Sequence, residues 1–335
     1  MSAYYNLQKA TPVIEFMIVL YGYSPTRRTF TGFSHLVDIL DHSGPTFRNK
    51  PGTIHRSIGM IIRATVKLHI WDGLQIWNWN PILYMLVGGM PQAVAAYTKT
   101  NNFTAVDLVK RDIIALYEED FGKMDDSGRA KAMYDAIPAQ LSKNALRYQV
   151  GKAVKDEKVE RIVNVVKEME DSMTVNVAYH SDDPNAGLAL TKNEEYFKMY
   201  ASDTGLFVTL AFKDSDITEN VIYDKLLNDK LSTNLGYVYK NVIAQMLRAT
   251  GKNLFYHTIP YSEGKKYYEI DFVIPHKHKV SPVEVKSSGY KTHKSLDVFC
   301  SKFSDRTMNK YLIYTKDYKR ENGVEYIPVY MTVFL

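Results

Sequence analysis

The fold of this chain is decided by residues 269–286, which read EIDFVIPHKHKVSPVEVK. Two apolar runs flank a short turn, a pattern typical of a β-hairpin. Side chains alternate between the two faces of a strand, so Glu284 and Lys286 share one face while the valines beside them enter the core. The hairpin can therefore bring Asp271 beside Glu284.

The hairpin supplies three candidate catalytic residues, Asp271, Glu284 and Lys286, of which Asp271 and Glu284 are candidate metal ligands. Two carboxylates on rigid strands repel each other unless a cation lies between them, and hard oxygen ligands suit Mg²⁺. The lysine could orient or deprotonate a water and neutralise charge on a phosphate. This is the D…ExK pattern of metal-dependent nucleases, although ExK alone is a weak signal because charged residues are common on half-exposed strands.

The elements around the hairpin predict an α/β fold. An amphipathic helix precedes it, with its apolar residues on one side and Gly251 at its end. Helix, three strands, helix and strand in succession favour a mixed sheet flanked by helices. The predicted elements are a helix over 234–249, strands over 254–258, 267–274 and 280–286, a helix over 296–303 and a strand over 310–314.

The middle of the chain predicts three helices followed by a hairpin, which is the layout of a winged helix. Pro138 should end the first helix and Ser142 should cap the second. The third, over 159–169, could lie in a DNA major groove, although a packing helix with a solvated polar face is the commoner explanation. Its groove-facing residues would be Lys158, Arg161, Asn164 and Lys167.

Further upstream, the sequence indicates a helix over 82–87, a glycine break, a helix that starts near Pro91 and a longer helix over 107–121. Residues 1–82 show neither helical nor strand periodicity.

Composition fits a globular protein, with 335 residues, 45% of them hydrophobic and 24% charged. The longest early apolar stretch is too short for a membrane span, so we expect no membrane partner. A single cysteine, Cys300, cannot form an internal disulfide and fits a reducing compartment. We therefore expect the protein in the cytoplasm.

Positive charge is concentrated near the C-terminus. Residues 201–335 carry 19 Lys and Arg against 15 Asp and Glu. A local basic patch attracts phosphate backbones, although a solvated lysine surface is the commoner explanation. The residues concerned, here called the C-terminal lysine set, are Lys277, Lys279, Lys286, Lys291, Lys294 and Lys302.

Beyond these patterns, residues 197–335 resemble the C-terminal domain of unknown function, of PD-(D/E)xK nuclease-like fold, found on prokaryotic AAA-type ATPases. The similarity extends to the linker and winged-helix region of that family, so it covers the chain from residue 82 onward. The motifs that carry it are Leu86-Val87-Gly88-Gly89-Met90-Pro91-Gln92, Pro138-Ala139-Gln140-Leu141-Ser142-Lys143, Phe197-Lys198-Met199-Tyr200, Asp203-Thr204-Gly205-Leu206, Gly236-Tyr237-Val238-Tyr239-Lys240-Asn241, Glu269-Ile270-Asp271-Phe272 and Pro282-Val283-Glu284-Val285-Lys286-Ser287.

The resemblance implies four regions. Residues 1–82 would be a degenerate remnant of an ATPase module, 83–125 a helical linker, 126–200 a winged-helix-like domain and 201–335 a restriction-endonuclease-like domain with a mixed sheet flanked by helices.

Two departures from the family matter. Lys240 stands where the family usually has a glutamate that completes the metal site, so we expect its ammonium group beside Asp271 and Glu284 and weak Mg²⁺ binding at most. The chain also contains no GxxxxGK(S/T) phosphate-binding loop, so we expect it neither to bind nor to hydrolyse ATP. Residues 1–82 would then be truncated, scrambled by a frameshift or genuinely divergent.

Three functional hypotheses follow. The chain could be a module that binds nucleic acid or a protein partner with little or no catalysis, which Lys240 favours. It could be an active Mg²⁺-dependent nuclease in which Glu269 replaces the lost glutamate. It could also be a truncated, non-functional product of an ATPase relative.

Overall fold

The computed structural model describes residues 81–335 except 144, 156, 215–219, 228–235 and 263–265, and Pro81–Leu335 form one compact unit. Nearly all of the predicted ATPase remnant, residues 1–82, lies outside the described residues. Within the part of the chain that is described, no helix is both long enough and apolar enough to span a bilayer.

The unit begins with three helices, α4 (Pro81–Val87), α5 (Pro91–Thr100) and α6 (Phe103–Met124), which confirms the predicted helix, break and helix. Pro91 occupies the first turn of α5, where its missing N–H costs nothing. Asn102 caps α6, because its side-chain oxygen accepts from the backbone N–H of Thr104 at 2.8 Å.

The next helices are α7 (Arg129–Asp135), α8 (Ile137–Ser142), α9 (Val150–Ala153) and α10 (Val159–Asp171). The predictions for Pro138 and Ser142 were wrong. Pro138 lies in the first turn of α8, where proline fits best, and Ser142 is the last residue of that helix. The third predicted helix is α10, and its apolar stripe is buried as expected.

The first sheet contains β1 (Val175–Ser181), β2 (Lys192–Ala201), β3 (Leu254–Pro260) and β4 (Tyr267–Ile270) in the order β2-β1-β3-β4. The predicted hairpin is β1 and β2, which pair antiparallel. On its other edge β1 pairs parallel with β3. The hairpin that we assigned to a winged helix therefore shares a sheet with a strand of the C-terminal region.

The second sheet has the order β5-β6-β7-β9-β8. Its hairpin of β5 and β6 confirms the one predicted, but the predicted strand over 267–274 is divided. Asp271 alone separates β4 from β5, so the chain passes from the first sheet to the second at this residue. The strands are β5 (Phe272–His276), β6 (Lys279–Val285), β7 (Lys310–Tyr314), β8 (Lys319–Glu321) and β9 (Val324–Pro328).

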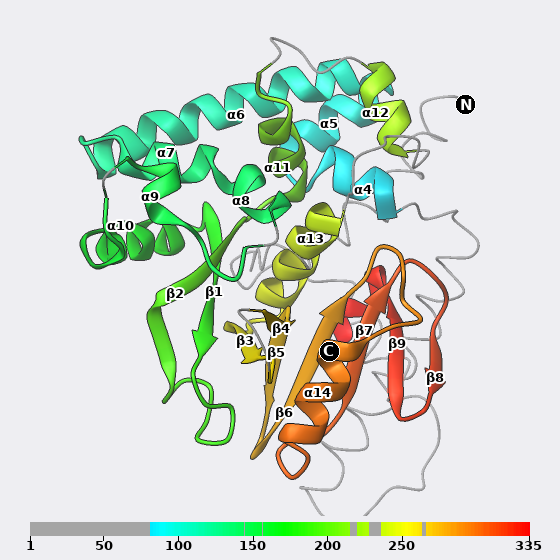
Figure 1. Cartoon of the computed structure of the whole chain (residues 1–335). Helices are drawn as coiled ribbons and strands as arrows, with labels where there is room; N and C mark the ends of the chain where they lie inside the picture. Colours follow the sequence, from blue (N-terminus) through cyan, green and yellow to red (C-terminus); the bar gives the residue numbers. More distant parts are fainter. Residues whose placement is uncertain (1–80, 144, 156, 215–219, 228–235, 263–265) are drawn as a thin grey trace, which may run out of the picture. The chain divides into compact units, whose positions relative to one another are not determined.

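Helices cover both sheets, which confirms the α/β class with mixed sheets (Figure 1). The largely buried α13 (Gly236–Ala249) packs on β2 and β6 and on the helices of the N-terminal half. On β4 and β6 lies α14 (Lys294–Lys302). The remaining elements are α11 (Thr204–Ala211), α12 (Asn220–Leu227) and the 3-10 helix η1 (Val329–Phe334).

A close contact of two glycines joins α4 to α11. A Cβ on Gly205 would lie 2.5 Å from Cα of Gly88, and Gly88 itself has a φ of +82°, so both positions require glycine. The buried Asp203 stabilises this contact. Its carboxylate accepts hydrogen bonds from the backbone N–H groups of Leu206 at 2.8 Å and Gly89 at 2.6 Å. Asp203 is also the N-cap of α11.

Candidate functional site

The two candidate metal ligands lie opposite each other on the β5–β6 hairpin. Phe272 pairs with Val283 in the antiparallel register, so the next pair along is Asp271 and Glu284. Both carboxylates are buried. The structure therefore brings together the two acidic residues that the sequence selected.

Every carboxylate oxygen of this pair already has a hydrogen-bond or ion-pair partner. For Asp271, Oδ1 lies 2.7 Å from Nζ of Lys240, and Oδ2 accepts from the backbone N–H of Val285 at 2.9 Å. For Glu284, Oε1 lies 2.8 Å from Nζ of Lys286, and Oε2 accepts from the backbone N–H of Leu296 at 3.3 Å. Each carboxylate is thus paired with one lysine and accepts one backbone hydrogen bond.

Lys240 reaches the site from α13, with 18% of its side chain exposed. The predicted pairing with Asp271 is confirmed, and a second carboxylate, Glu269, lies 3.6 Å away. The predicted proximity to Glu284 is not seen as an ion pair, because Glu284 takes Lys286 as its partner instead. The hairpin alternation explains this choice, since Glu284 and Lys286 share a strand face.

Sequence reasoning missed Lys198, which belongs to β2. Its ammonium group lies 2.6 Å from Glu269, and only 6% of its side chain is exposed. A lysine between Phe197 and Met199, in a strand segment buried on both faces, was the available signal. Such a lysine is almost never buried without a partner.

The two lysines that contact Glu269 have opposite pKa shifts. Burial lowers the pKa of Lys198, and its carboxylate contacts do not restore the usual value. Burial also opposes the charge on Lys240, but Asp271 and then Glu269 outweigh it and raise its pKa above the ordinary value. The protonated form of Lys240 is therefore firmly held.

The two hairpin carboxyls also differ. Burial favours the neutral acid in each. Lys240, followed by Lys198, nevertheless holds the pKa of Asp271 below its usual value. In Glu284, burial prevails over Lys286 and the pKa is raised. Asp271 is thus the more strongly ionised member of the pair.

Charges alternate along this ion-pair cluster, which we define as Lys198, Glu269, Lys240, Asp271, Glu284 and Lys286. Lys198 contacts Glu269, Glu269 contacts Lys240, and Lys240 contacts Asp271. Glu284 and Lys286 add a separate pair. Three ammonium groups therefore balance three carboxylates, and the cluster is neutral without any added ion.

This arrangement does not fit Mg²⁺. The oxygens of Asp271 and Glu284 point to N–H donors, and an added dication would stand beside the tethered charge of Lys240. No group of three His, Cys, Asp or Glu side chains suited to a metal occurs among the described residues. A hard cation prefers several free oxygen ligands, which the site does not offer.

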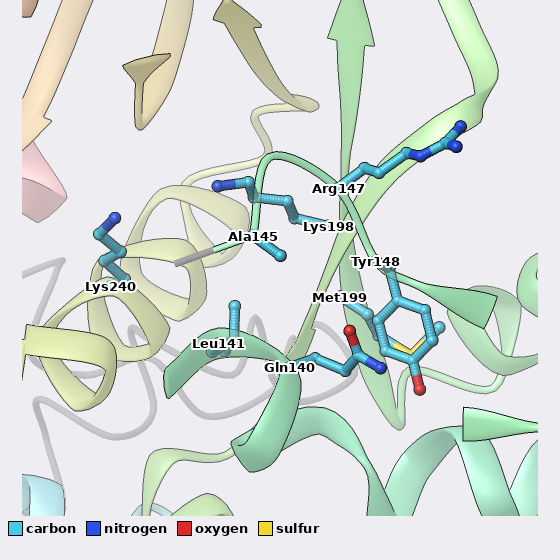
Figure 2. Close-up of a pocket in the computed structure, with 8 residues that line it drawn as sticks. All are labelled: Gln140, Leu141, Ala145, Arg147, Tyr148, Lys198, Met199 and Lys240. Atoms are coloured by element: carbon cyan, nitrogen blue, oxygen red, sulfur yellow. The ribbon is translucent and has the colours of Figure 1, made fainter. Parts of the chain in front are cut away.

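A small pocket opens beside the cluster. One wall comes from α8 and the segment after it, and the other from β2 and α13, which contribute Lys198 and Lys240 (Figure 2). The stem of Arg147 also lines it, while its guanidinium lies over the ring of Tyr196, 4.2 Å from the ring centroid. The lining includes three basic residues and, among the described residues, no carboxylate.

The predicted DNA-facing residues of α10 are exposed, but two of them have acidic partners. Lys167 lies 3.3 Å from Glu194 of β2, and Arg161 lies 3.9 Å from Glu157. Lys158 and Asn164 are also exposed. The contact with a groove stays a prediction.

Two family models match the chain. Residues 80–217 match the model described as Domain of unknown function (DUF8612), and residues 235–332 match Domain of unknown function (DUF4143). No curated protein and no solved structure matches. The C-terminal part of the chain is thus similar to a domain of unknown function, as the resemblance implied.

The ion-pair cluster spans both matches. Lys198 lies in the first matched region, whereas its partner Glu269 and the remaining members lie in the second. The pocket likewise takes most of its lining from the first region and Lys240 from the second. The candidate site is therefore a joint feature of the two regions.

Proposed function

We propose that residues 81–335 form a nucleic-acid-binding module of nuclease-like design, in which Lys240 stands in the place of a metal ion. The module would bind phosphate backbones with little or no cleavage. By the resemblance, it would correspond to the winged-helix and nuclease-like portion of an AAA-type ATPase relative.

The ion pair between Lys240 and Asp271, with its 2.7 Å contact, carries this proposal. A metal-dependent nuclease needs free carboxylate oxygens to hold the cation that activates water. Here a tethered ammonium group already neutralises Asp271, so a metal ion would have to displace it. Binding without turnover is therefore the function that the geometry supports best.

Nucleic-acid binding is supported by the C-terminal lysine set. Five of its six members are exposed, and the sixth, Lys286, is partly exposed beside Glu284. Aromatic rings accompany some of these cations, since Lys294 lies 5.7 Å from the ring centroid of Tyr268 and Lys302 lies 5.3 Å from that of Phe303. The ring of Tyr268 is partly exposed, and a basic side chain beside such a ring suits a phosphate backbone with exposed bases, whereas Phe303 is buried and cannot contact a base.

The competing hypothesis of an active nuclease required Glu269 to replace the missing metal ligand. Glu269 instead lies between two ammonium groups, 2.6 Å from Lys198 and 3.6 Å from Lys240. Serving as a ligand would require it to leave both. The geometry therefore favours the binding module over the enzyme.

Fluorescence anisotropy with a labelled DNA duplex tests the binding. We expect affinity at about 50 mM salt that falls steeply by about 200 mM, because phosphate contacts release counterions. The double variant Lys294→Gln with Lys302→Gln should bind more weakly and flatten the salt slope by about one unit for each lost contact. Lys99→Gln, an exposed lysine on α5, is the matched control and should bind like the wild type.

Two results would overturn the proposal. One is no affinity for duplex or single-stranded DNA or RNA at low salt, and the other is an affinity that salt does not change. If the double variant keeps the affinity of the wild type, the two lysines of α14 do not contact the nucleic acid, and the binding surface lies elsewhere on the protein.

A further inference from the structure

The pocket between α8, β2 and α13 offers a buried ammonium group, that of Lys198, whose one carboxylate partner among the described residues is shared with Lys240. Figure 2 shows Lys198 and Lys240 at this pocket, reaching it from different elements. Of the two, Lys198 is the more buried, with 6% of its side chain exposed against 18% for Lys240. Little water can therefore solvate Lys198.

The two ammonium groups differ in their countercharge. Within the described residues, Lys240 has two carboxylates at ion-pair distance, Asp271 and Glu269, whereas Lys198 has only Glu269. Glu269 is also shared between them. Their opposite pKa directions agree with this count, since burial prevails at Lys198 and the carboxylates prevail at Lys240.

Lys198 is also the end of the alternating chain of charges. The order Lys198, Glu269, Lys240, Asp271 begins with a cation at the pocket and ends with an anion at the hairpin. The Lys198 ammonium group also lies 5.3 Å from the ring centroid of Tyr256, but it has three N–H donors and Glu269 is its one ion-pair partner among the described residues, so it can still donate to a further acceptor. An anion in the pocket would extend the alternation and give Lys198 a second acceptor, beside the Glu269 carboxylate that it shares with Lys240.

We propose that this pocket binds a phosphate group, held by Lys198 and assisted by Lys240. A phosphate has several acceptor oxygens and can accept from both ammonium groups at once. The choice of phosphate as the anion rests on the proposed nucleic-acid function, whereas the anion site itself rests on the pocket and its lysines. The ligand would be either inorganic phosphate or the terminal phosphate of a nucleic-acid strand.

Phosphate binding here does not depend on a divalent cation, because the lysines supply the positive charge. Binding should therefore be the same with EDTA and with Mg²⁺. This separates the pocket from a metal-bridged phosphate site, in which a chelator abolishes binding.

Isothermal titration with inorganic phosphate tests the site, at an ionic strength held constant with sodium chloride. The double variant Lys198→Gln with Glu269→Gln removes both charges of this ion pair, so neither partner is left as an unpaired buried charge. It should bind phosphate roughly 10- to 150-fold more weakly than the wild type, the range for losing one hydrogen bond to a charged group. Lys99→Gln should bind like the wild type, and thermal melts of each variant report whether it is folded.

A short oligonucleotide with a 5′-phosphate, compared with the same strand ending in a 5′-hydroxyl, identifies the source of the phosphate. A strand terminus as ligand predicts tighter binding of the phosphorylated strand, and loss of that difference in the double variant. Equal binding of both strands, with inorganic phosphate still bound, assigns the pocket to a free phosphate compound.

The proposal is overturned if inorganic phosphate fails to bind the wild type, or binds wild type and folded double variant equally. Failure of the proposed function looks different, because duplex binding would then be absent while phosphate binding at Lys198 persists.

Discussion

Removing Lys240 should destabilise the protein measurably. Lys240→Met leaves Asp271, with 7% of its side chain exposed, as an uncompensated buried charge. Breaking a buried pair in this way costs about 3–5 kcal/mol. Asp271 keeps its hydrogen bond from Val285, and Lys198 still acts on it electrostatically, so we expect the lower end of this range, about 3 kcal/mol.

Urea denaturation of four proteins measures this effect: wild type, Lys240→Met, Asp271→Asn and the double variant. The double variant should lose less than the sum of the single losses, because it leaves no unpaired charge. A coupling free energy of about 1–3 kcal/mol is expected for residues in direct contact. Lys99→Met on the exposed face of α5 is the control and should change stability by less than about 0.5 kcal/mol. A loss at Lys240 no larger than at Lys99, or additive single losses, would refute the pairing.

Three further predictions concern pH, packing and nucleotide binding. Lys240 and Lys198 hold the pKa of Asp271 below its ordinary value of 3.8, so the ionised carboxylate of Asp271 stabilises the protein above pH 4, and this contribution is lost as the pH falls. The difference in free energy of unfolding between the wild type and the double variant Lys240→Met with Asp271→Asn should therefore become smaller in acid. Gly205→Ala should lower the free energy of unfolding in denaturant by about 1–3 kcal/mol or more, because its Cβ would lie 2.5 Å from backbone atoms at Val87 and Gly88. The control Gly122→Ala has open space on α6 and should stabilise the protein. Equal effects of the two substitutions would contradict the close contact. Calorimetry should detect no ATP binding, since the sequence has no phosphate-binding loop, and micromolar affinity would show that prediction to be wrong.

The local features of the fold could be predicted from the sequence. The helix over 236–249 and the hairpin at residues 272–285 are encoded by periodicity and turn residues close together in the chain. Lys240 stands where the resembled family usually has a glutamate of the metal site, and this correspondence predicted its contact with Asp271.

The long-range partners could not be predicted in this way. Lys198 and Glu269 are far apart in the sequence and lie on β2 and β4, the two outer strands of one sheet, and no local pattern specifies the order of its strands. The break of the strand at Asp271 was also missed, because an alternating pattern continues through it. Pro138 was misread because proline both ends one helix and begins another.

The central claim, that Lys240 takes the place of a metal ion, is tested most directly by metal titration. Calorimetric Mg²⁺ titrations on wild type, Lys240→Glu and Lys240→Glu with Asp271→Ala would be paired with a nuclease assay on a DNA duplex. Wild type should show no measurable Mg²⁺ affinity and little or no cleavage. Lys240→Glu should gain affinity, because it replaces the tethered cation by a third carboxylate near Asp271 and Glu269. The double variant should lose that gain. Robust Mg²⁺-dependent cleavage by the wild type would contradict the claim.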